Sequence, residues 1–287
     1  MSSDWSSDVC SSDLLDGLRI AVDCANGATY RVGPDTFSEL GAEVIPIGNT
    51  PDGLNINANV GAVSPEEMRA TVIREKADLG IAFDGDGDRV AMSDENGRLL
   101  EGNALLAIIG ADRLEQGELP QKTLAATIMA NGGLEKALAP LGGKVVRANV
   151  GDRYVVEAMR QHGLTVGGEP SGHLVMLDYN VTGDAMIAAL QVLAIMLRRD
   201  QPLSVLGQIY REMPECHDKV PLNGKPRPAQ KLLDALAQEY DGELNGTGRI
   251  VLRPSGTEPV VRIMVQHEHL RKAEALTRAL VEKVAEL

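Results

Sequence analysis

The sequence has few aromatic residues, few cysteines and no long apolar run, and each scarcity excludes a class of protein. Aromatic residues make up 3% of the 287 residues, so a core must be built from Leu, Val, Ile, Ala and Met. The longest apolar candidate, AMIAALQVLAIML, is interrupted by Gln191 and followed by Arg198 and Arg199. It predicts a buried helix, because a membrane span needs about 18 apolar residues in a row. Three cysteines without CxxC spacing indicate neither a zinc site nor a disulfide framework, and favour a reducing cytoplasm.

Positive charge is also scarce. The chain has 28 basic and 41 acidic residues, which gives a formal charge of −13. This balance disfavours non-specific binding to nucleic acid or to an anionic membrane. An anionic small molecule would therefore need arginines placed locally around it. The composition is that of a globular chain long enough for two or three domains, and it does not define an oligomeric state.

The first fourteen residues differ from the rest of the chain. MSSDWSSDVCSSDL repeats Ser-Ser-Asp three times and lacks the basic and apolar regions of a secretory signal. We interpret residues 1–14 as a non-native or disordered leader and leave them out of the fold prediction. A cloning remnant, a gene-prediction artefact and a disordered tail all stay open as explanations.

From Leu15 onward, short apolar runs alternate with helix-like segments, which predicts an α/β fold. We expect two successive α/β domains with mixed or parallel sheets, at residues 15–118 and 119–210. A proline-rich segment then leads into a small α+β domain at residues 211–287. Within the first domain, SPEEMRATVIREKA predicts a helix with Ser64 as its N-cap, Pro65 as its first residue and Glu67 completing a capping box.

The stretch IAFDGDGDRVAM contains three aspartates that alternate with glycines, Asp84, Asp86 and Asp88, directly before Arg89. Carboxylates on a tight turn can converge on one hard divalent cation, so this loop predicts a site for Mg²⁺, Ca²⁺ or Mn²⁺. An EF-hand would need glycine where Arg89 stands, and helices where LGIAFD and RVAMSD predict strands. A solvated Asp-Gly turn is the structural alternative.

Three further stretches carry side chains suited to a sugar phosphate. GGEPSGH offers Glu169, Ser171 and His173, whose donors and acceptors suit sugar hydroxyls. NVGDRYV places Arg153 at the start of a helix, where an anion can bind, although Asp152 could simply cap that helix. Taken alone, a polar loop and a helix cap explain these two stretches at least as well.

The last stretch, RPSGTEPVVRI, predicts a phosphate-binding turn. Its backbone N–H groups and hydroxyls can surround phosphate oxygens, and arginine forks match phosphate geometry. The candidate residues are Arg253, Ser255, Gly256, Thr257 and Arg262. A hairpin turn between two solvated arginines is an equally good explanation of this stretch by itself.

In this order and at these separations, the four stretches resemble the α-D-phosphohexomutase superfamily, from about Leu15 to Leu287. The closest resemblance is to the bacterial branch that acts on glucosamine phosphates. The resemblance implies Mg²⁺ on Asp84, Asp86 and Asp88, and sugar contacts from the GEPSGH loop. It also implies phosphate contacts from the RPSGTEPVVRI turn, with Arg89 and Arg153 near the transferred phosphoryl group.

The implied reaction interconverts glucosamine 6-phosphate and glucosamine 1-phosphate through a phosphoserine and a sugar bisphosphate, and feeds cell-wall precursor synthesis. The family's serine lies on a Thr-Ala-Ser-His-Asn-Pro-like loop, which this sequence lacks. We therefore expect a truncated mutase that is inactive alone, or else a non-catalytic metal- and sugar-phosphate-binding protein. Pro170 stands where that branch has glutamine, so mannose or glucose phosphates remain alternative substrates.

Overall fold

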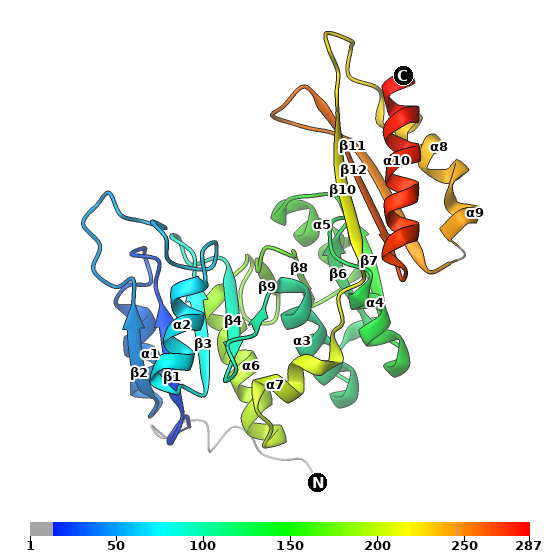
Figure 1. The fold of residues 1–287 in the computed structure, drawn as a ribbon. Helices are drawn as coiled ribbons and strands as arrows, with labels where there is room; N and C mark the ends of the chain where they lie inside the picture. Colours follow the sequence, from blue (N-terminus) through cyan, green and yellow to red (C-terminus); the bar gives the residue numbers. More distant parts are fainter. Residues whose placement is uncertain (1–13, 245) are drawn as a thin grey trace. The chain divides into compact units, whose positions relative to one another are not determined.

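The computed structural model describes residues 14–244 and 246–287, which form two compact units (Figure 1). The first unit extends to Ala130 and resumes at Leu134–Tyr210. The second unit combines Asn131–Gly133 with Arg211–Leu287. The leader expected at the start of the chain lies outside the described residues except for Leu14, and the domain boundaries near residues 118 and 210 stay predictions.

The first sheet has five strands in the order β2-β1-β3-β4-β5, with β1, β2 and β3 parallel and β4 and β5 antiparallel to their neighbours. Alternate residues of β1 face opposite layers: Val22 packs with Phe37 of α1, and Ala21 with Met68 of α2. Both faces are covered, which explains why the middle strand β3, LGIAF, is apolar and buried throughout. The elements are β1 (Arg19–Asp23), α1 (Val32–Glu39), β2 (Glu43–Ile47), α2 (Glu66–Glu75), β3 (Leu79–Phe83), β4 (Val90–Asp94) and β5 (Leu99–Leu100).

Helix α2 forms where the sequence predicts it, but its first turn differs from the prediction. Pro65 is the N-cap and no side chain caps the helix, so the predicted capping box is wrong. The Ser64 hydroxyl instead donates to the Glu66 carboxylate at 3.1 Å. The Glu67 carboxylate faces along the helix, where it accepts from Thr71 at 3.3 Å. Because proline lacks an N–H, the helix can begin one residue later without losing a backbone hydrogen bond.

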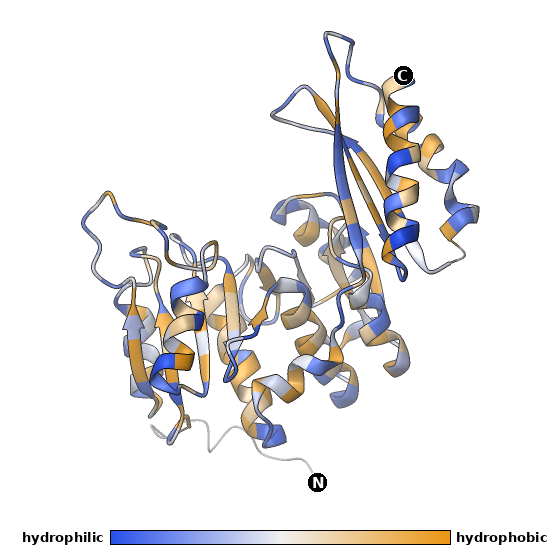
Figure 2. Cartoon of the chain, in the orientation of Figure 1, coloured by the Kyte–Doolittle hydropathy of each residue, from blue (hydrophilic) through white to orange (hydrophobic). Residues whose placement is uncertain are grey.

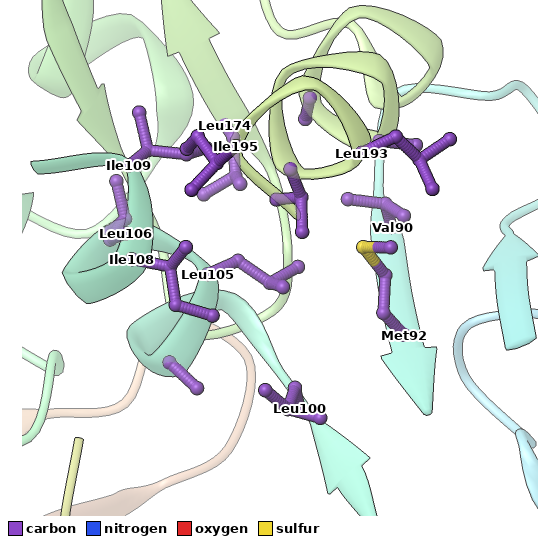
Figure 3. Close-up of a cluster of buried hydrophobic side chains, with 14 of the residues drawn as sticks. Val90, Met92, Leu100, Leu105, Leu106, Ile108, Ile109, Leu174, Leu193 and Ile195 are labelled. Atoms are coloured by element: carbon purple, nitrogen blue, oxygen red, sulfur yellow. The ribbon is translucent and has the colours of Figure 1, made fainter. Parts of the chain in front are cut away.

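The second sheet has the order β7-β6-β8-β9, with β7, β6 and β8 parallel and β9 antiparallel. Side chains of α3 and α6 pack with Val90 and Met92 of β4 and with Leu174 of β9 in one cluster (Figure 3). The two sheets therefore share a core, which fixes β4 and β9 relative to each other. The elements are α3 (Gly102–Gln116), η1 (Pro120–Lys122), β6 (Thr123–Thr127), α4 (Gly133–Leu138), η2 (Ala139–Leu141), β7 (Lys144–Ala148), α5 (Asp152–His162), β8 (Val166–Gly168), β9 (Leu174–Met176), α6 (Ala185–Arg199), α7 (Leu203–Leu206) and η3 (Gly207–Ile209).

The second unit contains an antiparallel sheet in the order β10-β12-β11. Apolar and polar residues alternate along α10 (Figure 2), and its buried positions include Ala273, Leu276, Leu280 and Val284 at helical spacing. They pack on the sheet in a separate core. The elements are β10 (Glu215–Pro221), α8 (Gln230–Glu239), α9 (Asp241–Leu244), β11 (Gly248–Pro254), β12 (Val260–His267) and α10 (Leu270–Glu286).

The predicted fold class is confirmed: two α/β parts with mixed sheets precede an antiparallel α+β part. Among the described helices, none combines the length and apolar character that crossing a bilayer requires. The apolar segment that contains Gln191 forms α6, whose inner face is buried in the shared core.

Candidate functional site

The aspartate loop lies between β3 and β4, at the edge where the parallel strands β1 and β3 end. Loops that follow parallel strands meet at this edge of a sheet, where α/β proteins bind ligands. The Ala28 N–H, from the loop after β1, donates to the Gly85 carbonyl at 2.8 Å. A Cβ atom on Gly27 would lie 2.2 Å from the same carbonyl oxygen, so only glycine permits this approach. The neighbouring loop thus holds the aspartate loop by its backbone.

The three carboxylates converge as the sequence predicts, with ligand atoms within 4.8 Å of one another. Asp84 is buried, and its Oδ1 accepts from the N–H groups of Asp88 and Arg89 at 3.1 and 3.0 Å. Asp86 is exposed. Asp88 is half-buried, and its Oδ1 is shielded from solvent without a hydrogen-bond partner among the described residues.

The electrostatics of this loop favour a bound cation. Burial raises the pKa of Asp84 to about 6, the backbone N–H of Arg89 opposes that rise, and the nearby carboxylates of Asp88 and Asp86 add to it. The Arg89 guanidinium lies 3.8 and 3.7 Å from Asp84 and Asp88 and offsets part of the negative charge. An all-oxygen ligand set, with one buried oxygen that accepts no hydrogen bond among the described residues, fits a hard divalent ion such as Mg²⁺.

The flanks of the loop exclude an EF-hand. Strands β3 and β4 pair antiparallel from Leu79 opposite Asp94 to Phe83 opposite Val90. An EF-hand needs helices on both sides of its loop. The buried Asp88 Oδ1 lies 3.7 Å from Arg89 Nε but accepts no hydrogen bond among the described residues. This also disagrees with a merely solvated Asp-Gly turn, because such an atom is costly unless something binds it.

The GEPSGH loop, which connects β8 to β9, lies directly against the aspartate loop. Arg89 and His173 form an isolated antiparallel bridge, and the Val90 N–H donates to the Gly172 carbonyl at 3.1 Å. The His173 Nδ1 lies 3.1 Å from Asp88 Oδ2. Gly172 has a φ of +88°, and a Cβ atom there would lie 2.1 Å from the Val90 carbonyl oxygen. The fold thus joins two motifs that are more than 80 residues apart.

Glu169 connects this loop to the start of α5. Its Oε1 accepts from the Gly151 N–H at 2.9 Å, and its Oε2 accepts from the Ser171 hydroxyl at 3.4 Å. The carboxylate is therefore fixed, while Ser171 stays exposed for a ligand. Gly151, rather than Asp152, is the N-cap residue of α5, so the interpretation of Asp152 as a side-chain cap is wrong.

Arg153 is exposed and is held by its neighbour. Its guanidinium lies 4.9 Å from the centre of the Tyr154 ring and donates to the Tyr154 hydroxyl at 3.2 Å. Within the described part of the chain, no hydrogen bond or ion pair joins Arg153 to the aspartate loop. Its predicted role at the phosphoryl group therefore stays a prediction.

The phosphate-binding turn connects β11 to β12 in the second unit. Arg253 and Arg262 are directly opposite each other across these strands. Burial lowers the pKa of Arg253, and the positive charge of Arg262 lowers it further. Two positive charges in this position repel each other, and a bound anion would reduce that repulsion. Glu258 partly offsets it through an ion pair with Arg262.

At the tip of this turn, one residue is hydrogen-bonded within the turn and two residues are exposed. The Ser255 N–H donates to the Val260 carbonyl at 2.9 Å, and its hydroxyl accepts from the Glu258 N–H at 3.2 Å. Ser255 is buried, so its backbone N–H is committed to the hairpin. Gly256 and Thr257 are exposed and offer their backbone and hydroxyl groups to a ligand.

Sequence reasoning missed a buried aspartate at the end of β1 and a backbone contact of the aspartate loop. Asp23, at the end of β1, is fully buried and accepts from the N–H groups of Ala25 and Gly61 at 2.9 and 2.7 Å. Burial raises the pKa of Asp23, although these two hydrogen bonds oppose the rise. The Ala185 N–H, at the start of α6, donates to the Gly87 carbonyl at 3.2 Å. The sequence signal that could have identified Asp23 is its position at the end of an apolar strand.

Comparison with known proteins gives the family to which this fold and these loops belong. Three family models match in sequence order: phosphoglucomutase/phosphomannomutase alpha/beta/alpha domain II at residues 5–97, alpha/beta/alpha domain III at 101–213, and the C-terminal domain at 218–283. The chain belongs to the phosphohexomutase superfamily, of which it contains domains II, III and IV.

Two curated relatives carry the name phosphoglucosamine mutase. The protein from Anaeromyxobacter dehalogenans is 48% identical over 272 residues, which cover 94% of this chain and 59% of the relative. The protein from Desulfotalea psychrophila is 49% identical over 259 residues, which cover 88% of this chain and 56% of the relative. This chain therefore spans somewhat more than half the length of these relatives.

Solved structures support the fold assignment. A phosphoglucomutase/phosphomannomutase family protein from Burkholderia thailandensis matches with a TM-score of 0.76 at 23% identity, covering 94% of this chain and 61% of that chain. The Aspergillus fumigatus N-acetylphosphoglucosamine mutase, solved with GlcNAc-6P and magnesium, matches with a TM-score of 0.67 at 21% identity. That match covers 93% of this chain and 66% of that chain.

Proposed function

We propose that this chain supplies the metal-, sugar- and phosphate-binding parts of a phosphoglucosamine mutase, which interconverts glucosamine 6-phosphate and glucosamine 1-phosphate. One observation carries the proposal: the aspartate loop, in which a buried Asp88 oxygen accepts no hydrogen bond among the described residues, lies backbone to backbone against the GEPSGH loop. A cation and sugar hydroxyls could therefore bind side by side. The identity of 48% to a protein of that name supports the same choice of sugar.

Each part of the site has a proposed role. Asp84, Asp86 and Asp88 hold Mg²⁺, which when bound would draw negative charge from the phosphoryl oxygens. Glu169 and Ser171 contact sugar hydroxyls, and Arg89 and Arg153 stabilise the moving phosphoryl group. The RPSGTEPVVRI turn holds the other phosphate through Arg253, Ser255, Gly256, Thr257 and Arg262.

Phosphoryl transfer also needs a nucleophile. The sequence contains no Thr-Ala-Ser-His-Asn-Pro-like loop, which carries the serine in this family by resemblance. We propose that this chain binds the hexosamine phosphate without turning it over, and that a first domain bearing that loop, together with a sugar bisphosphate, completes the enzyme. The metal and sugar-phosphate contacts alone would describe a binding protein, and a coupled mutase assay on the chain with and without a serine-bearing domain distinguishes the two.

Calorimetric titration tests the binding half of the proposal. With Mg²⁺ present, we expect glucosamine 6-phosphate to bind more tightly than glucose or mannose 6-phosphate. Arg253→Gln should weaken binding of all three by at least about tenfold, because a charged hydrogen bond to phosphate contributes about 1.5–3 kcal/mol. Arg271→Gln, an exposed arginine of α10, is the matched control and should change nothing. A preference for mannose 6-phosphate would overturn the choice of sugar.

A further inference from the structure

Three positively charged side chains form a row across the sheet of the second unit. Arg262 of β12 is directly opposite Arg253 of β11 on one side and Lys219 of β10 on the other. Directly opposite residues of antiparallel strands face the same side of a sheet, so the three side chains share one face. This face is turned away from α10, because the residues that follow or precede them in sequence belong to the core that includes α10: Val220, Leu252 and Val261. Lys219 therefore lies beside the two arginines of the phosphate-binding turn.

Glu258 shows that Lys219 and Arg262 can hold one anion together. Glu258 is the acidic residue of the RPSGTEPVVRI turn, and it forms ion pairs with both cations. Its Oε2 pairs with Arg262, and its Oε1 lies 3.6 Å from Lys219 Nζ. The carboxylate thus bridges the two cations, as the oxygens of a bound anion could.

The charge of the row favours a doubly charged anion. Arg253, Arg262 and Glu258 together leave one net positive charge, and Lys219 adds a second. A phosphate monoester carries about −1.5 to −2 charge at pH 7, so Lys219 brings the charge of the turn close to the opposite of the phosphate charge. The Lys219 side chain is 61% exposed. Its flexible stem and three donors allow it to turn from a carboxylate to a phosphate oxygen.

We propose that Lys219 is a third phosphate-binding side chain, beside Arg253 and Arg262. In the ligand-free chain Glu258 pairs with Lys219 and Arg262, and the substrate phosphate replaces that carboxylate on both cations. The sequence motif does not include Lys219, because this residue lies on β10, outside the RPSGTEPVVRI stretch. The inference rests on the proposed function, since it requires that this turn bind the phosphate of the substrate.

Calorimetric titration of the full chain with glucosamine 6-phosphate tests the proposal. Lys219→Gln should weaken binding by about three- to tenfold, between the effect of an exposed ion pair and that of a charged hydrogen bond. Lys219→Arg should stay within about threefold of the unsubstituted chain, because it keeps the charge and the donors. Lys231→Gln, on an exposed lysine of α8, is the matched control and should change nothing.

Glu258→Gln distinguishes a direct contact with phosphate from an effect through the carboxylate. This substitution removes the competing anion, so it should not weaken binding of glucosamine 6-phosphate. Lys219→Gln should still weaken binding when Glu258→Gln is present. If Lys219 acts only by holding Glu258, its substitution will have no effect in that background, and the inference is then wrong.

The Arg253→Gln variant separates failure of this inference from failure of the proposed function. Weaker binding in Arg253→Gln but unchanged binding in Lys219→Gln would overturn the inference and leave the proposed function intact. An unsubstituted chain that does not bind glucosamine 6-phosphate would overturn both.

Discussion

At the scale of single residues, the aspartate loop contains one carboxylate that holds the loop together, Asp84, and one that is exposed, Asp86. Asp84 is buried and one of its oxygens accepts hydrogen bonds from two backbone N–H groups, whereas Asp86 is exposed. Substitution of Asp86 should therefore affect metal binding without affecting folding. Asp84 and Asp86 should therefore respond differently to substitution, because they differ in burial and in hydrogen bonding.

Asp86→Asn should not lower the unfolding temperature of the metal-free chain, because it removes a negative charge that repels Asp84, and it should remove most of the increase that Mg²⁺ produces. A ligand that binds only the folded state stabilises it in proportion to the logarithm of its concentration, so weaker binding gives a smaller increase. Differential scanning fluorimetry with EDTA and with Mg²⁺ measures both quantities. Asp16→Asn, an exposed aspartate outside the loop, is the control. An undiminished Mg²⁺ effect in Asp86→Asn would contradict the site.

Asp23 predicts a pH dependence of stability. Its folded-state pKa is raised above 3.8, chiefly by burial, so the unfolded chain loses this proton first as the pH rises. The stability that Asp23 contributes is therefore complete below about pH 4 and is lost as the pH rises through the folded-state pKa.

Comparison with Asp23→Asn, which does not titrate, isolates this contribution. The free energy of unfolding of the unsubstituted chain, minus that of the variant, should increase as the pH falls from 7 toward 4. Urea unfolding at several pH values measures the difference. The contributions of the other titrating groups, which both chains share, cancel in it. A difference that stays constant or decreases toward pH 4 would mean that Asp23 has no raised pKa in the folded chain.

At the scale of elements, backbone contacts between loops position the site more than side-chain contacts do. Gly172 allows the GEPSGH loop to lie against β4, and the same residue has a positive φ. Gly53 has the same φ of +88° but nothing within 4 Å of its added Cβ atom. Substitutions at Gly53 and Gly172 therefore separate the free-energy cost of an alanine at positive φ from the cost of a clash between its Cβ atom and the neighbouring backbone.

Gly53→Ala should lower the free energy of unfolding by about 1 kcal/mol, the cost of a left-handed alanine. Gly172→Ala should cost at least about 2 kcal/mol more, because its Cβ atom would overlap the Val90 carbonyl. Denaturant unfolding of both variants measures the difference. Equal losses would show that the sugar loop is not held against β4.

Sequence patterns predict the elements and the separate loops well, because apolar periodicity and alternating carboxylates are local signals. The strands on either side of Asp84 and the helix that ends at Arg199 form as expected. The first turn of α2 is an exception, since Pro65 takes the position predicted for Ser64.

Contacts between distant loops are not predictable in this way. Nothing in the sequence around Asp88 indicates that His173, 85 residues further on, lies against it. The same limit applies to Asp23, whose partner Gly61 is 38 residues away. Such contacts depend on which strands become neighbours and in which register, and a single sequence gives no direct measure of either.

At the scale of the whole molecule, the described chain carries two sets of binding groups on two compact units. The metal loop and the sugar loop belong to the first unit, and the arginine-flanked turn belongs to the second. Neither set includes the family's serine loop, since the sequence has no such motif. The proposed function therefore assigns binding to this chain and phosphoryl transfer to its combination with a serine-bearing domain.

A coupled mutase assay tests this central claim most directly. The chain alone is compared with a fusion that places the first domain of the Anaeromyxobacter dehalogenans relative before Leu15, both with Mg²⁺, a sugar bisphosphate and glucosamine 6-phosphate. The account predicts glucosamine 1-phosphate from the fusion, its loss in the fusion carrying Asp86→Asn, and none from the chain alone. Turnover by the chain alone, or a folded fusion that binds the substrate but forms no product, would contradict it.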